Sequence, residues 1–211
     1  MSKNILIATN LNVWSIKKGV GAPSFYKTLE FYNNENCNVY LYTTESDLDI
    51  SELKNIHIIK MPKLKTISIK YLYFITRIIN YFLYQIIFLF YFAIKQKKKI
   101  DLYYGYEIEF IPSLSLLSKI LKKPLVSRFQ GTILHPLMNR RFWKLKYFPH
   151  YFSIKQNANL TIMTDDGTKG DTVISKIRDT LDNTLFLKNG IDFLKIDEND
   201  ISSQVKYKIW L

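Results

Sequence analysis

Short apolar runs alternate with longer amphipathic stretches along the whole chain. The apolar runs predict about seven strands, at residues 4–9, 39–44, 56–61, 102–104, 124–129, 160–163 and 184–188. Helical patterns lie between them, at residues 24–34, 67–94, 112–121, 140–156 and 168–181. This strand–helix alternation predicts an α/β fold, a doubly wound and mainly parallel sheet with helices on both faces.

The predicted topology also indicates where a ligand would bind. In open parallel sheets, ligands lie at the carboxyl ends of the strands, near the point where the strand order reverses. The loops that follow the first, fourth and fifth strands are therefore the candidate site. They cover residues 11–22, 105–110 and 130–137.

The composition is that of a folded, basic protein. Of its 211 residues 47% are hydrophobic, and Lys and Arg exceed Asp and Glu by 30 to 18, a net charge of +12. Such a surface attracts phosphorylated ligands, nucleic acid or anionic lipid, and composition does not choose among them. No nucleic-acid-binding motif is present, so we expect no nucleic-acid partner.

Cysteine and histidine usage points to a reducing compartment without a metal site. Cys37 is the single cysteine, so no intrachain disulfide can form. The three histidines, His57, His135 and His150, do not have a zinc-ligand spacing. The N-terminus enters a strand directly and lacks the features of a signal peptide. We expect a cytoplasmic protein without a metal or other cofactor.

The longest apolar stretch, residues 78–94, carries no formal charge over seventeen residues and is followed by Lys95, Lys97, Lys98 and Lys99. It is at the lower limit for a membrane span. Polar and aromatic residues recur through it at helical spacing, which favours an amphipathic helix. We expect it to pack on the sheet with one side and to contact an anionic membrane with the other, through these four lysines. An ordinary core helix is the alternative.

Two loops carry residues suited to polar ligands. Gly19 and Gly21 precede a helix, where backbone N–H groups can approach a phosphate, although a plain strand–helix turn would read the same. Ser24 replaces the third glycine of a dinucleotide fingerprint. After the fifth strand, polar side chains that can bind phosphate or sugar hydroxyls gather around a glycine. The polar residues are Arg128, Gln130, Thr132 and His135, and the glycine is Gly131.

His135 and the acidic pair Asp165 and Asp166 have two interpretations each. His135 can act as a base or be a surface or capping residue. The two aspartates can do acid–base or metal chemistry, but before a helix and beside Gly167 they are typical caps.

Taken in order, these segments resemble the N-terminal domain of the retaining family-4 glycosyltransferases of GT-B fold, which is Rossmann-like. The resemblance rests on Gly19-Val-Gly21, Asp101-Leu-Tyr-Tyr, Arg128-Phe-Gln-Gly-Thr132, Asp165-Asp-Gly-Thr168 and Asn189-Gly-Ile-Asp192. It implies that residues 1–190 form the acceptor-side domain, with the hinge at Asn189, Gly190 and Asp192. Residues 191–211 would then begin a donor-binding domain that this sequence does not contain.

The resemblance also implies roles for the loops. Gly19 and Gly21 would approach the donor diphosphate, and the loop from Arg128 to Thr132, with His135, would bind the acceptor. Many relatives have a histidine where this chain has Gln130, which departs from the family pattern.

The expected function is therefore transfer of a sugar from a nucleotide-sugar donor to a cell-envelope glycan or glycolipid, at the inner face of the cell membrane. We expect the chain to be inactive by itself. The alternatives are a non-catalytic Rossmann-like binding module and, less favoured, a nucleotide-binding oxidoreductase. The oxidoreductase lacks support because Tyr42, Thr43 and Thr44 stand where an acidic residue should end the second strand.

Overall fold

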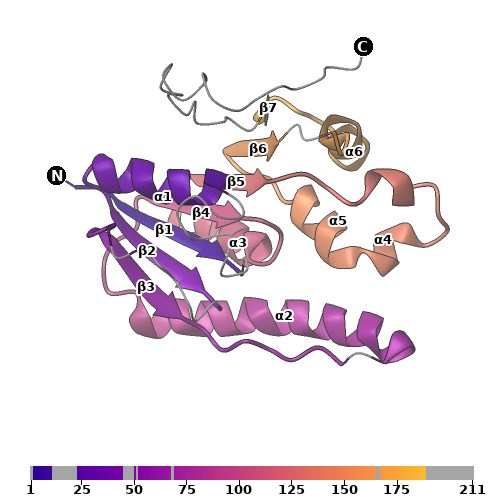
Figure 1. Ribbon diagram of the computed structural model, residues 1–211, viewed down its shortest axis with the longest axis horizontal. Helices are drawn as coiled ribbons and strands as arrows, with labels where there is room; N and C mark the ends of the chain where they lie inside the picture. The colour runs from indigo at the N-terminus through magenta and orange to yellow at the C-terminus, as the bar shows by residue number, and fades with distance from the viewer. Residues whose placement is uncertain are drawn as a thin grey trace, which may run out of the picture.

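Within the described residues, seven parallel strands form one sheet in the order β3-β2-β1-β4-β5-β6-β7. The computed structural model describes residues 2–10, 23–44, 50, 52–67, 69–164 and 167–188. The strands are β1 (Asn4–Thr9), β2 (Asn38–Thr43), β3 (Ile56–Lys60), β4 (Leu102–Tyr106), β5 (Leu125–Phe129), β6 (Leu160–Thr164) and β7 (Thr184–Leu187). The predicted doubly wound α/β fold is confirmed (Figure 1).

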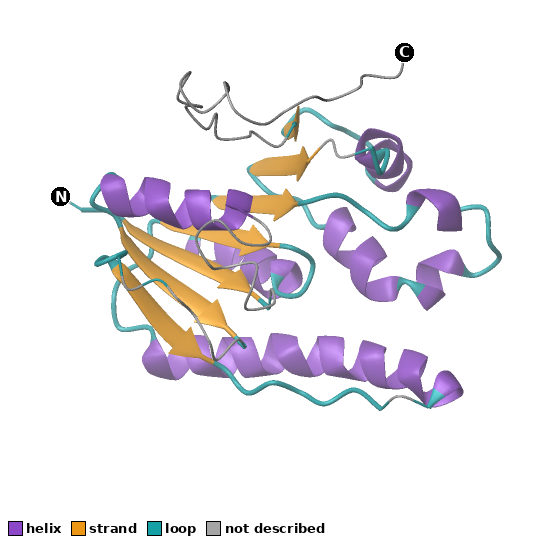
Figure 2. Ribbon diagram, viewed as in Figure 1, coloured by secondary structure: helices purple, strands orange, loops and turns teal. Residues whose placement is uncertain are grey.

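Helices cover both faces of this sheet. They are α1 (Pro23–Asn34), α2 (Lys70–Lys95), α3 (Ile111–Leu121), the 3-10 turn η2 (His135–Leu137), α4 (Trp143–Lys146), α5 (Phe148–Lys155) and α6 (Gly170–Ile177). Figure 2 shows α1 and α2 on opposite sides of the sheet. Helix α2 is antiparallel to the strands, so its first turns lie toward the carboxyl ends of the strands and its last turn lies at their amino ends.

The alternation of side chains along β1 explains why its sequence is continuously apolar. Ile7 packs with Phe25 of α1, while Leu6 faces the other way and packs with Phe88 of α2 and Leu114 of α3. Because successive residues of a strand point to opposite faces, a strand that is covered on both faces needs apolar residues at every position.

The strand order reverses between β1 and β4. Helix α1, the next described element after β1, and α3, which follows β4, lie on opposite faces of the sheet, which opens a crevice at the carboxyl ends of the two strands. Strand β4 continues through Gly105 to Tyr106, two residues beyond its predicted end. A Cβ on Gly105 would lie 2.2 Å from Cδ1 of Ile111, so glycine allows α3 to approach the strand closely.

The predicted helix at 140–156 is wrong, because the segment is divided into α4 and α5. Phe142 has a left-handed backbone with φ 60°, and Tyr147 between the two helices has φ −116° and ψ 36°. Pro149 lies in the first turn of α5, where its missing N–H costs no helical hydrogen bond.

The predicted helix at 168–181 is too long, because α6 covers only Gly170–Ile177. Arg178 is extended, and its guanidinium donates hydrogen bonds to the carbonyls of Ile154 and Gln156 and to Oγ1 of Thr161. These long-range bonds turn the chain out of the helix.

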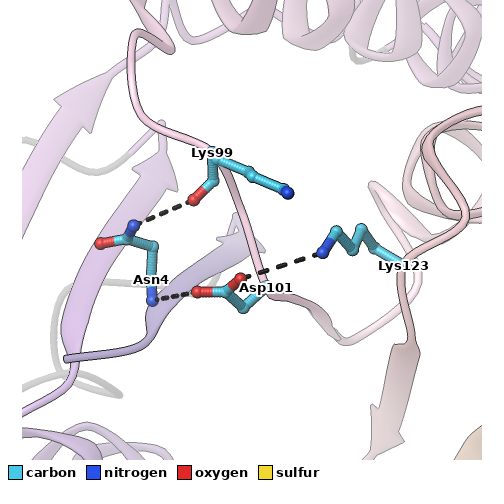
Figure 3. A network of polar contacts seen from close by, with 4 residues as sticks. All are labelled: Asn4, Lys99, Asp101 and Lys123. Carbon is cyan, nitrogen blue, oxygen red and sulfur yellow. Dashed lines mark hydrogen bonds and ion pairs between the residues drawn. The ribbon is translucent and has the colours of Figure 1, made fainter. Parts of the chain in front are cut away.

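A polar network joins the amino ends of β1 and β4. The backbone N–H of Asn4 donates to the Asp101 carboxylate at 3.0 Å, and the Asn4 side chain donates to the carbonyl of Lys99 at 2.9 Å (Figure 3). Lys123 is 3.9 Å from the same carboxylate. This network joins the amino ends of the two strands, at the end of the sheet opposite to the crevice. Lys99 takes part through its backbone carbonyl.

Candidate functional site

A cavity of about 380 Å³ lies at the carboxyl ends of the strands, beside the point where the strand order reverses. Its walls come from residues that follow β1, β2, β3 and β4 and from α2 between Tyr73 and Tyr84. The lining residues are Asn10, Thr44, Lys63, Leu64, Thr66, Tyr73, Arg77, Asn80, Tyr84 and Glu109. All but Leu64 carry a polar group, which suits a ligand rich in hydroxyl or charged groups.

A larger hollow, of about 730 Å³, lies at the opposite end of the sheet, where the strands begin. Lys3, Cys37, Asp101 and Pro124 contribute to it, all near the amino ends of strands. Ligands of parallel sheets bind at the carboxyl ends, so the smaller and more polar cavity is the candidate site.

Glu109, in the loop between β4 and α3, is the acidic residue of this cavity. Burial raises the pKa of its carboxyl to about 7, although Arg77 and a hydrogen bond from Asn10 oppose the rise. Near neutral pH such a carboxyl exists in both protonation states, and it can accept or donate a proton.

Arg77 connects Glu109 to His150 of α5. Its guanidinium Nη2 lies 2.8 Å from Nε2 of His150. Because a guanidinium only donates hydrogen bonds, Nε2 must accept and the proton of the neutral ring resides on Nδ1. Burial and the neighbouring Arg77 lower the pKa of His150 to about 4, which keeps the ring neutral.

Hydrogen bonds from α2 hold the walls of the cavity in place. Tyr84 Oη accepts from the backbone N–H of Leu64 at 2.9 Å, and the Asn80 amide donates to the carbonyl of Lys65 at 3.0 Å. These two bonds fix the segment after β3. The Gln85 side chain donates to the carbonyl of Glu109 and accepts from Ser113 Oγ at 2.7 Å, which positions the loop that carries Glu109.

This arrangement explains the polar and aromatic stripe of α2. Arg77, Asn80 and Tyr84 face the domain, where they line the cavity. The helix therefore turns its polar residues inward at this end and its apolar residues outward.

The five residues predicted to bind the acceptor gather at the end of β5, beside the cavity rather than in its lining. Arg128 lies on the α1 side of the sheet, where it donates to Thr28 Oγ1 at 3.2 Å and stands over the Tyr106 ring at 5.5 Å. The Gln130 side chain donates to Tyr106 Oη at 2.9 Å, and its backbone N–H donates to Glu107 Oε1 at 2.8 Å.

Hydrogen bonds between backbone N–H groups and threonine side chains hold the rest of this loop. Gly131 has φ 144°, in the region that favours glycine. The Thr132 N–H donates to Thr168 Oγ1, and Thr132 Oγ1 accepts from the N–H of Leu134. His135 begins η2. A role for these residues in acceptor binding stays a prediction.

Other predicted positions lie outside the described residues. These are Gly19 and Gly21 of the donor loop, the pair Asp165 and Asp166, and the hinge residues Asn189, Gly190 and Asp192. Lys95, Lys97, Lys98 and Lys99 are all exposed, at the amino edge of the sheet.

Sequence reasoning missed Glu109, Arg77 and Asn10 as site residues. The predicted loop 105–110 did include Glu109, and an acidic residue in a crevice loop was the available signal. Arg77 was recognisable as the single charge among apolar residues, but only the packing of α2 shows that it points toward Glu109.

Comparisons with known proteins place this fold. No family model matches the chain, and no curated protein matches it. Among solved structures, HepE (Alr3699) of Anabaena, in complex with UDP and glucose, is similar with a TM-score of 0.55 and 16% identity, over 90% of this chain and 45% of that chain. Sucrose-phosphate synthase of Thermosynechococcus elongatus has a TM-score of 0.57 and 12% identity, over 90% and 48%.

At these identities the shared property is the fold. The chain has the Rossmann-like fold of a GT-B glycosyltransferase domain, as expected. It spans about half the length of these two proteins.

Proposed function

We propose that the chain is the acceptor-side domain of a nucleotide-sugar glycosyltransferase. The observation that carries the proposal is the polar cavity at the reversal point of a sheet that has the fold of GT-B glycosyltransferase domains. Membership of the retaining family 4 belongs to the proposal and rests on the order of the sequence motifs.

The chemistry of the cavity suits a sugar acceptor. The side chains of Thr44, Asn80 and Tyr73 offer hydroxyl and amide groups that can pair with sugar hydroxyls. Glu109, with a pKa of about 7, can hydrogen-bond the reacting acceptor hydroxyl and take up its proton. Arg77 supplies a positive charge beside this carboxyl.

The donor side of the proposal rests on sequence alone. Gly19 and Gly21 would approach the diphosphate of a nucleotide sugar, and Arg128, Gln130, Gly131, Thr132 and His135 would face the acceptor from the neighbouring loop. The net charge of +12 favours such an anionic donor. The reaction would use no metal or other cofactor. The acceptor would be a cell-envelope glycan or glycolipid, at the cytoplasmic face of the membrane.

Binding of acceptor analogues to the isotope-labelled chain tests the proposal. We expect alkyl glycosides or short oligosaccharides to shift the NMR signals of the residues that line the cavity, in a saturable manner. Glu109→Gln should weaken this binding several-fold, because the amide cannot accept a hydrogen bond at both atoms. Glu35→Gln, an exposed change at the opposite edge, is the matched control.

The same titrations separate the alternatives. If glycosides leave the cavity signals unchanged at high concentration, the acceptor-site proposal is wrong. Specific binding of a reduced nicotinamide cofactor, with hydride transfer, would instead favour an oxidoreductase.

A further inference from the structure

Helix α2 exposes a continuous apolar stripe on its outer side. The members recur every three or four residues, as one face of a helix requires. They are Leu72, Ile75, Ile79, Phe82, Leu83, Ile86, Phe90 and Ile94. Ile86 is 63% exposed and Phe90 is 61% exposed, whereas Tyr81 and Phe88 on the opposite side are fully buried. An uninterrupted apolar patch of this length indicates contact with a partner or a membrane.

Helix α2 is part of the domain and does not leave it to cross a membrane. By length and composition, residues Leu72–Lys95 are apolar enough to do so. Its inner face, however, binds His150 through Arg77 and Ser113 through Gln85, and it buries Phe88 in the core. A span would remove these groups from the sheet and place a charge in hydrocarbon. The stripe therefore fits a helix that lies along the membrane surface.

A basic and aromatic cluster lies beside the first half of this stripe. It consists of α4 and the residues before it, Arg140, Arg141, Phe142, Lys144, Leu145 and Lys146, and all of these are exposed. Phe142 is 67% exposed and Leu145 is 59% exposed. The cluster adjoins the stripe because Phe148, two residues after Lys146, packs against Phe82 with ring centroids 5.6 Å apart.

Cations and rings alternate in this cluster. Arg141 stands over the Phe142 ring at 4.8 Å, and Lys144 stands near the Trp143 and Tyr151 rings at 5.8 and 5.4 Å. Aromatic bodies with adjacent basic groups are the side chains that favour the boundary between headgroups and acyl chains.

We propose that the α2 stripe and the α4 cluster together form the surface with which this protein lies on an anionic lipid bilayer. The stripe enters the interface, and the cluster contacts the headgroups on the side of the cavity. Helix α2 is about 39 Å long for its 26 residues, and the four lysines from Lys95 to Lys99 lie at and beyond its last residue. They contribute a second and more distant contact.

The charges argue for lipid rather than for a second copy of the chain. A dimer with two-fold symmetry that used the stripe would bring the same surface of both copies into contact. In an antiparallel arrangement the α4 cluster of one copy would meet the Lys95–Lys99 end of the other, and both are positive. Such a contact is repulsive, whereas anionic headgroups complement both ends.

The placement of this surface also specifies the acceptor. Tyr73, Arg77 and Asn80, in the first turns of α2, line the cavity from the inner side of the same helix. An acceptor sugar in the cavity is thus one helix diameter from the bilayer. This step rests on the proposed function and favours a lipid-linked sugar over a soluble glycan.

Co-sedimentation with vesicles tests the surface without any glycosyl chemistry. The full chain is mixed with vesicles of phosphatidylcholine alone or with 30% phosphatidylglycerol, at several salt concentrations. We expect binding to the anionic vesicles that weakens with salt. Arg140→Gln with Arg141→Gln should weaken it about 30-fold, since each basic residue near an anionic surface contributes a factor of about five. The double change Lys54→Gln with Lys176→Gln, two exposed lysines on other elements, is the control with equal charge loss.

The stripe has its own test. Ile86→Ser with Phe90→Ser changes exposed residues only, so the fold should be retained, as circular dichroism can verify, and vesicle binding should be lost at low salt as well. If the Arg140/Arg141 change and the lysine control reduce vesicle binding equally, the proposal is overturned. It is also overturned if vesicle binding survives the Ile86/Phe90 change. A dimer in light scattering that the stripe change converts to a monomer, without vesicle binding, would assign the stripe to a second copy instead. Glycoside titration of the cavity is independent of all these results.

Discussion

Glu109 and His150 both lie close to Arg77, and their ionisation gives the cavity a measurable pH signature. Burial raises the pKa of Glu109 from 4.5 to about 7 and lowers that of His150 from 6.5 to about 4. The raised carboxyl contributes stability that is full below pH 4.5 and is lost as the pH rises through about 7. The lowered imidazole contributes stability that is present above pH 6.5 and is lost as the pH falls toward about 4.

The two contributions have the same size and opposite signs. Each pKa unit corresponds to 1.36 kcal/mol, so each group changes the free energy of unfolding by about 3 kcal/mol over its range. Between about pH 4.5 and 6.5 the folded state holds the carboxyl proton that the unfolded state has released, and lacks the imidazole proton that the unfolded state has bound. The changes that the two groups cause in the free energy of unfolding with pH therefore cancel in the wild-type protein.

Replacing one of the two groups should reveal the pH dependence that the other gives to the free energy of unfolding. For Glu109→Gln, the free energy of unfolding relative to wild type should rise by about 3 kcal/mol from pH 4.5 to pH 8. For His150→Asn, the same difference should rise by a similar amount as the pH falls from 7.5 to 4. Constant offsets from lost contacts do not affect these slopes.

Urea unfolding, followed by tryptophan fluorescence at each pH, measures both differences. Glu35→Gln, at the opposite edge of the sheet, serves as the control for a lost carboxyl. If the difference between Glu109→Gln and wild type stays constant across this pH range, the described environment of Glu109 is wrong. The same holds if both variants slope in the same direction.

Three further predictions follow from the packing and the fold. Gly105→Ala should destabilise the protein by about 1–3 kcal/mol in urea unfolding. Adding Ile111→Val should restore part of this loss, because it removes the Cδ1 atom that the new Cβ meets. If the second change restores no stability, α3 does not approach β4 as closely as described. Phe88→Ala should cost about 3–5 kcal/mol, whereas Phe90→Ala should stay within about 0.5 kcal/mol, and equal losses would mean that α2 is rotated from the described orientation. The purified chain, assayed with a panel of nucleotide sugars and acceptors, should show no efficient transfer by itself, and robust turnover would refute the assignment to the acceptor side alone.

The strands could be predicted from the sequence because a sheet covered on both faces leaves a local signal. Residues 5–8 are all apolar, and the structure has β1 over the predicted residues 4–9. Helix boundaries at 140–156 and 168–181 could not be predicted in this way. The first depends on the backbone at Phe142 and Tyr147, and the second on the contacts of Arg178 with Ile154, Gln156 and Thr161.

The polar cavity lies at the carboxyl ends of the strands, where the sequence pattern indicated a ligand site, but among the described residues of the three predicted loops only Glu109 lines it. Alternation of strands and helices is enough to locate a crevice at the carboxyl ends of the strands. Which side chains meet there depends on the rotation of α2 about its axis. That rotation turns Arg77 toward Glu109 and His150, which are 32 and 73 residues away in the sequence.

The sequence by itself determined the order of strands and helices, the basic charge and the presence of one long amphipathic helix, since each of these is a property of neighbouring residues. Tertiary structure alone decided which face of that helix is buried. Periodicity shows that α2 has two faces, but an apolar stripe normally packs inward. Here the core beside the sheet buries Tyr84 and Phe88, and α5 contacts Tyr81 through Ser153 and Phe148. The polar cavity takes up Arg77 and Asn80, so the remaining apolar residues are left on the outside.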